Sequence, residues 1–144
     1  MPSVRITSVD TETGDGHSKD LFDPFTDPLK LVMFVSVSPD LVRAENIILG
    51  GTFQIIELRT NQVVVDHYVQ TNYNGQVLGT NFLWWLGSPT PHAWGLNWGP
   101  GDIFGLRAAV EVSQYQGNES GLVALDAFDV SSTRWFRLMD VFTL

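Results

Sequence analysis

The sequence predicts one all-β domain over residues 1–144, an antiparallel β-sandwich of about seven to nine strands. Its apolar and β-branched stretches are short, and no stretch of ten or more residues has a helical period. Gly, Pro and Asn separate these stretches at short intervals, which favours a sandwich over a parallel sheet with crossover helices. The chain has 144 residues, the usual size of one domain.

Residues 103–112 give the clearest strand signal. Phe104, Leu106, Ala108, Val110 and Val112 alternate with smaller or charged residues. A period of two with one mostly apolar face is typical of a half-buried strand. We therefore expect these five side chains to face the core.

The first third of the chain begins with a strand at residues 4–9 and an acidic loop at residues 10–28, with an extended edge near residues 21–22. Residues 29–37 are apolar on both faces and predict either a central strand covered on both sides or one strand of a sandwich interior. Residues 41–49 are long enough for one helical turn only. The pair Gly50-Gly51 is interpreted as a break in regular structure before the next strand.

The middle of the chain predicts a hairpin, with strands at residues 52–59 and 62–69 joined at Thr60-Asn61. A turn region at residues 72–79 follows, then a strand at residues 81–86. Phe82, Trp84 and Leu86 fall on one face of that strand, and Leu83 and Trp85 on the other.

Residues 87–101 form a loop rich in Trp, Pro and Gly, called here the Trp loop. After the 103–112 strand, a polar turn at residues 114–121 precedes two last strands at residues 122–130 and 134–142. Pro100-Gly101-Asp102 leading into an alternating strand resembles the penultimate strand of immunoglobulin-like bacterial domains. The resemblance is one of outline and implies an immunoglobulin-like or related sandwich.

Composition narrows the function classes. The absence of cysteine excludes disulfides, thiolate metal sites and cysteine nucleophiles, and leaves the source compartment undetermined. A net charge of −8 repels phosphate backbones, so nucleic acid is not an expected partner. No signal peptide and no apolar run of membrane-spanning length is visible, so we expect a soluble chain without a membrane span.

The tryptophans suggest a ligand surface. Four of the five lie between Trp84 and Trp98. Carbohydrate sites use flat aromatic rings, on which the C–H faces of a sugar stack while polar groups hold its hydroxyls. The candidate residues for such a site are Trp85, His92, Trp94, Asn97, Trp98 and Asp102. The alternative is that these rings plug one end of the sandwich or fill a subunit interface, because a Trp buries a large area.

The acidic loop raises a calcium hypothesis. Asp10, Glu12 and Asp15 supply hard oxygen ligands at near-alternate positions, although Gly14 occupies a position where the EF-hand loop needs a ligand. The simpler interpretation is a solvated loop that needs no cofactor.

No catalytic constellation is evident: the chain has no Gly-x-Ser-x-Gly elbow, and its three histidines are far apart in sequence. The leading hypothesis is a non-catalytic module that acts in self-assembly or as a structural or accessory subunit through apolar surfaces. Its partner would be another copy or another protein, and the low charged fraction of 17% favours this view. The alternative is a carbohydrate-binding module using the loop tryptophans, and a small hydrolase-type enzyme is a further alternative.

Overall fold

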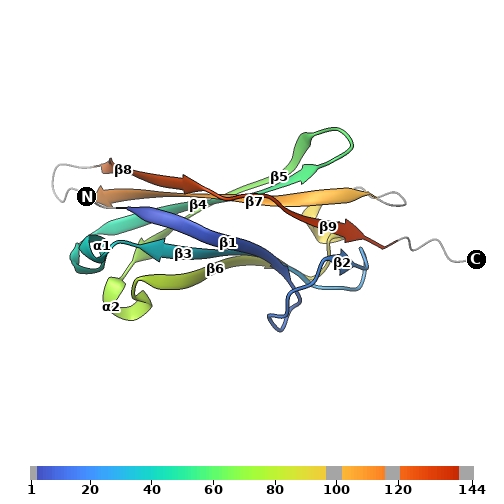
Figure 1. Cartoon of the computed structure of the whole chain (residues 1–144), viewed down its shortest axis with the longest axis horizontal. Helices are drawn as coiled ribbons and strands as arrows, with labels where there is room; N and C mark the ends of the chain where they lie inside the picture. The colour runs from blue at the N-terminus through green and yellow to red at the C-terminus, as the bar shows by residue number, and fades with distance from the viewer. Residues whose placement is uncertain (1–2, 97–101, 116–120, 140–144) are drawn as a thin grey trace, which may run out of the picture.

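A computed structural model of the chain describes residues 3–96, 102–115 and 121–139, and shows two β-sheets packed face to face (Figure 1). Nine strands lie in the described residues: β1 (Val4–Glu12), β2 (Leu21–Phe22), β3 (Leu29–Val37), β4 (Ile47–Glu57), β5 (Gln62–Tyr73), β6 (Asn81–Ser88), β7 (Ile103–Tyr115), β8 (Leu122–Val130) and β9 (Arg134–Leu138). Three short helical segments join them: α1 (Pro39–Arg43), α2 (Gly75–Leu78) and the 3-10 turn η1 (His92–Trp94). The predicted all-β sandwich is confirmed.

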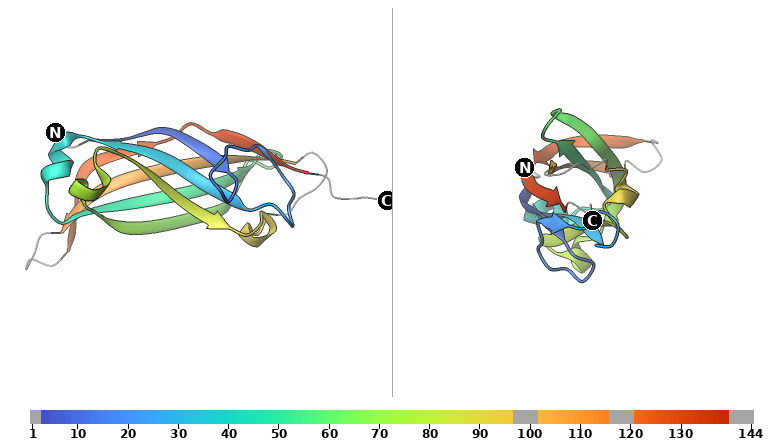
Figure 2. Two further views of the ribbon diagram at one scale, coloured as in Figure 1. Left: turned by 90° about the horizontal axis from the view of Figure 1, so that it is seen from below. Right: turned by 90° about the vertical axis from the view of Figure 1, so that its right-hand side faces the viewer.

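The smaller sheet has the strand order β1-β3-β6, and the larger has the order β2-β9-β7-β4-β5 with β8 also beside β7. Strand β7 is long enough for two neighbours on one edge, β9 along its first half and β8 along its second. All pairings are antiparallel except the short β2–β9 pair. The strands run along the long axis of the molecule, and the end view shows the two layers (Figure 2).

The hydrophobic core lies between the sheets. The five alternating residues of β7 predicted to face it are all buried. Strand β3 contributes Leu31, Met33 and Val35, and β4 contributes Phe53 and Ile55. The predicted alternation in β6 is also confirmed, because Phe82, Trp84 and Leu86 pack against the core while Leu83 and Trp85 are exposed.

The interpretation of Gly50-Gly51 as a break before a strand is wrong, because both residues lie inside β4. A Cβ atom on Gly51 would lie 2.8 Å from the ring of Trp84, which packs on it from the core side. On the opposite side of the strand, a Cβ atom on Gly50 would collide with the Tyr68 hydroxyl oxygen. These glycines therefore make room for the Trp84 ring and the Tyr68 hydroxyl, and do not end a strand.

Several predicted boundaries shift. The acidic loop begins later than expected, because residues 10–12 continue β1, and the Trp loop begins after Ser88. The expected turn at 72–79 holds the end of β5 and then α2, whose first turn is capped by the Asn74 side chain. The last strand ends at Leu138, and residues 140–142 of its predicted range lie outside the described part. Within the described ranges, no helix is long and apolar enough to cross a membrane.

Candidate binding face

The Trp loop turns one of its rings inward. Trp94 is half-buried and packs against the core, and its Nε1 points at the carbonyl oxygen of Leu29 at 3.5 Å. The exposed His67 of β5 meets it edge-on, with ring centroids 5.6 Å apart. Trp94 therefore closes the space between the sheets at this end of the sandwich.

The other predicted ligand residues of this loop are dispersed. His92 is exposed and contacts the ring of Phe25 at 5.0 Å between centroids, and its backbone N–H donates to the Pro24 carbonyl oxygen. Asp102 is half-buried just before β7. Asn97 and Trp98 lie outside the described residues, so the loop-tryptophan platform stays a prediction.

Trp85 lies on the outer face of the smaller sheet and does not share a surface with Trp94, which packs against the core. Its side chain is 47% exposed. The ammonium group of Lys30 lies over its ring, 4.2 Å from the centroid, a cation–π contact. One side of this ring is therefore already occupied.

The three acids of the calcium hypothesis have separate environments. The Asp10 carboxylate forms an ion pair with Arg134 Nε at 2.9 Å and accepts a hydrogen bond from Ser18 Oγ at 2.8 Å. Glu12 is buried, which raises its pKa, and its hydrogen bond with Asp10 raises it further. Asp15 is exposed, and the Thr13 hydroxyl and then His17 lower its pKa by stabilising the carboxylate.

Across residues 3–96, 102–115 and 121–139, no cluster of three or more acidic or histidine side chains is arranged to hold a metal ion. The calcium site stays a prediction.

The larger sheet has an outer face that the sequence analysis did not single out. The side of this sheet that is turned away from the core is called here the outer face. The larger sheet is the upper layer in Figure 1. Strand register places Phe128, Glu111, Gly50 and Gln70 in one row across it. The next row holds Val130, Ala109, Thr52 and Tyr68. Farther along β7 come Arg107 with Gln54, and then Gly105 with Trp135.

Tyr68 lies across β4 rather than standing up from the sheet. From β5 it reaches over Gly50 and donates a hydrogen bond to Glu111 Oε1 of β7 at 2.8 Å, while accepting one from Gln70 Nε2 at 3.1 Å. Partial burial raises the pKa of its hydroxyl, and the bond to Glu111 adds to this, so the proton stays on Tyr68. The ring is held in place and is still 51% exposed.

Trp135 repeats this arrangement at the other end of the face. It stands opposite Gly105 in the β7–β9 ladder, and a Cβ atom on Gly105 would lie 2.8 Å from its six-membered ring. The indole therefore lies against the backbone of β7, with 45% of the side chain exposed. In the described part of the chain, no cation lies over this ring.

Two adjoining hollows lie on this face. One, of about 380 Å³, is lined by Thr52, Gln54, Arg107, Ala108, Ala109 and Val130. The other, of about 190 Å³, extends to Gly50, Glu111 and Phe128 and shares Thr52, Ala109 and Val130 with the first. Arg107 is held in place by Gln54, whose Oε1 accepts from its Nη2 at 3.0 Å and its Nε at 3.3 Å. We call the two hollows together the trough.

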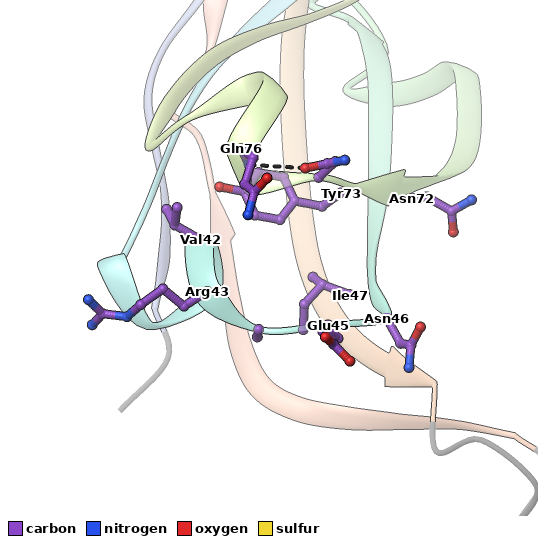
Figure 3. A pocket seen from close by; sticks show the side chains of 11 residues that line it. Val42, Arg43, Glu45, Asn46, Ile47, Asn72, Tyr73 and Gln76 are labelled. Carbon is purple, nitrogen blue, oxygen red and sulfur yellow. Dashed lines mark hydrogen bonds between the residues drawn. The ribbon is translucent and has the colours of Figure 1, made fainter.

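A further depression lies at the end of the sandwich near α1 and α2, with a volume of about 750 Å³ (Figure 3). Arg43 extends away from it on one side and Asn72 on the other (Figure 3). Its aromatic lining residue, Tyr73, is buried and donates its hydroxyl proton to the Gly79 carbonyl oxygen. This depression offers amide groups but no exposed ring, which distinguishes it from the trough.

Glycines inside strands are the one feature of the sequence that points to the outer face. Glycine inside a strand often marks a place where another group approaches the backbone closely. Gly105 interrupts one face of the alternating β7 segment, and Gly50 lies in β4. Which rings cover them depends on register with β9 and β5, and local sequence does not determine that register.

Comparison with models of known protein families finds no match, and comparison with curated proteins finds none either. Among solved structures, the chain is similar to a Bacteroides uniformis β-glucuronidase, with a TM-score of 0.51 and 8% identity over 92% of this chain. The structure of β-glucuronidase 2 of the same organism, covalently bound to cyclophellitol-6-carboxylate aziridine, gives a TM-score of 0.49 at 10% identity, also over 92% of this chain. The chain spans 14% of the length of each. At these identities the likeness concerns the fold alone.

Proposed function

We propose that this chain is a non-catalytic carbohydrate-binding module whose binding surface is the outer face of the larger sheet. The observation that carries the proposal is the pair of half-exposed aromatic side chains on the same face, Trp135, whose ring lies against Gly105, and Tyr68, whose hydroxyl lies over Gly50. Rings that lie along a sheet offer a flat apolar surface on which the C–H face of a sugar stacks. Because both rings are already held in place, little conformational entropy is lost on binding.

The polar groups of the trough complement the two rings. Arg107, Gln54 and Glu111 provide donors and acceptors within reach of sugar hydroxyls that lie over the sheet. Binding sites are commonly apolar surfaces with a few fixed polar groups. The fold likeness to a solved glycosidase structure is compatible with this proposal but does not specify a ligand.

Self-assembly through the same face is the second candidate. Phe128 and Val130 of β8 are 69% and 56% exposed. Together they give the edge of this sheet an exposed apolar surface that a second copy could cover. In an assembly these side chains would be covered by a second copy, and the trough would be covered with them.

Native affinity electrophoresis in gels containing soluble neutral polysaccharides tests the proposal, with β-glucan, xylan and galactomannan as probes and polygalacturonate as the anionic comparison. We expect a neutral polysaccharide to retard the native chain, and the double variant Tyr68→Ala/Trp135→Ala to bind at least tenfold more weakly, about 1.4 kcal/mol. Trp85→Ala is the matched control, because this ring is equally exposed on the other sheet.

Unchanged mobility in every gel, or an equal loss in Trp85→Ala, would contradict carbohydrate binding at the outer face. Light scattering coupled to size-exclusion chromatography of the same samples tests the second candidate, self-assembly. A stable oligomer that Phe128→Ser dissociates would favour assembly.

A further inference from the structure

Building on the proposed function, we infer that Trp135 and Tyr68 bind two parts of one ligand, a neutral and extended β-1,4-linked glycan chain that lies along β7. The alternative is that each ring is a separate site for one sugar residue. The spacing of the rings, the shape between them and the charge of the face together favour one continuous chain.

The spacing follows from strand register. Trp135 is opposite Gly105, and the Tyr68 hydroxyl reaches Glu111, six residues farther along β7. At a rise of about 3.3 Å per residue, Gly105 and Glu111 are about 20 Å apart along β7, and Gly105 and Ala109, whose row holds Tyr68, are about 13 Å apart, so the Tyr68 ring lies between these two distances from Trp135 along the strand. One sugar ring is much shorter than either distance, whereas an oligosaccharide of several residues covers both.

The trough leaves room for such a chain. Between the two rings, β7 presents Arg107 and Ala109 to the outer face, and β4 presents Thr52 and Gln54 beside them. Arg107 is half-buried and held by Gln54, so it lies low in the trough. A ligand that stacks on Trp135 and continues along β7 therefore passes over a low floor of mixed polar and apolar residues before it reaches Tyr68.

The charge of this face favours a neutral ligand. Arg107 is offset by Glu111 in the trough, and Asp66 is the register neighbour of Gln54 on β5. The whole chain has a net charge of −8, which opposes the approach of a polyanion. Two rings separated along one sheet also require a ligand that stays extended between them. Backbones of β-1,4-linked glucose, xylose or mannose are extended, whereas α-1,4-linked glucans coil.

Calorimetric titration with ladders of cello-, xylo- and manno-oligosaccharides, from disaccharide to hexasaccharide, tests this inference, with maltohexaose as the coiled comparison. For one of the three extended series we expect affinity to rise with chain length and level off once both rings are covered, with one ligand per protein chain. We expect Trp135→Ala and Tyr68→Ala each to weaken hexasaccharide binding at least tenfold while changing disaccharide affinity little. Trp135→Tyr, which keeps a ring, should recover most of the loss and shows that the surface remains folded.

Equal affinity at every length, two hexasaccharides bound per chain, or a variant at one ring without effect would overturn the single-chain inference and leave carbohydrate binding intact. Tighter binding of maltohexaose would overturn the straight-ligand requirement. Failure of every oligosaccharide and every polysaccharide to bind would overturn both the inference and the proposed function.

Discussion

The outer faces of the two sheets carry tryptophans of almost equal exposure, 47% for Trp85 and 45% for Trp135, in different surroundings. Each packs near a glycine, Gly87 or Gly105. The ring of Trp85 is covered by the ammonium group of Lys30 at 4.2 Å, whereas in the described residues no cation covers Trp135. Exposed fraction alone therefore does not distinguish a ring available to a ligand from one engaged within the fold.

The polar groups around the two rings differ in the same way. Next to Trp85, Lys30 pairs in register with Glu12, and Asp10 is bound by Arg134. In the trough beside Trp135, the guanidinium group of Arg107 donates a hydrogen bond to the neutral side-chain amide of Gln54. On the smaller sheet the nearby charged groups are thus engaged by the Trp85 ring and by Arg134 of β9, whereas the larger sheet presents polar groups close to its rings.

The largest expected effect separates rings that hold the fold from rings that face outward. Trp84 packs on Gly51 from the core side, so Trp84→Ala should lower the free energy of unfolding by about 3 kcal/mol. Trp135→Ala and Trp85→Ala should each lower it by about 1 kcal/mol or less. Urea denaturation of the three variants measures this. If Trp135→Ala costs as much as Trp84→Ala, Trp135 serves the fold and the comparison between the two faces fails.

A smaller effect tests the charged surroundings of Trp85. Burial, followed by the hydrogen bond with Asp10, raises the pKa of Glu12 above its ordinary value of 4.5. The folded state therefore binds this proton more tightly than the unfolded state, and its stability falls as the pH rises from about 4.5 through the raised pKa. Glu12→Gln removes this penalty, so the variant should be slightly more stable than the native chain at neutral pH.

The advantage of Glu12→Gln should shrink as the pH falls and disappear below the unfolded-state value. Thermal unfolding of both proteins across this pH range shows whether it does. A variant that is less stable than the native chain at neutral pH would mean that the Glu12 carboxylate is stabilised by Lys30 and Arg134 more than it is penalised by burial.

Patterns that are local in sequence predicted the fold well. The alternation in β7 and β6 assigned the buried and exposed sides correctly, because neighbouring residues of a strand face opposite ways. The binding face was not predicted, because Tyr68 and Trp135 are distant in sequence from Gly50 and Gly105. The sequence left open whether Trp94 belongs to a ligand platform or plugs one end of the sandwich; it packs against the core, and local sequence does not determine which way a loop turns its rings.

The most direct test of the binding face is a nuclear magnetic resonance titration with cellohexaose, xylohexaose and mannohexaose. The indole N–H groups of the five tryptophans give separate signals that can be assigned by substitution. The account predicts that one of these sugars shifts the signal of Trp135 and the ring signals of Tyr68, and leaves those of Trp84 and Trp85 in place. A shift of Trp85, Trp94 or Trp98 with Trp135 unmoved would contradict it and assign the ligand to the Trp loop or the smaller sheet.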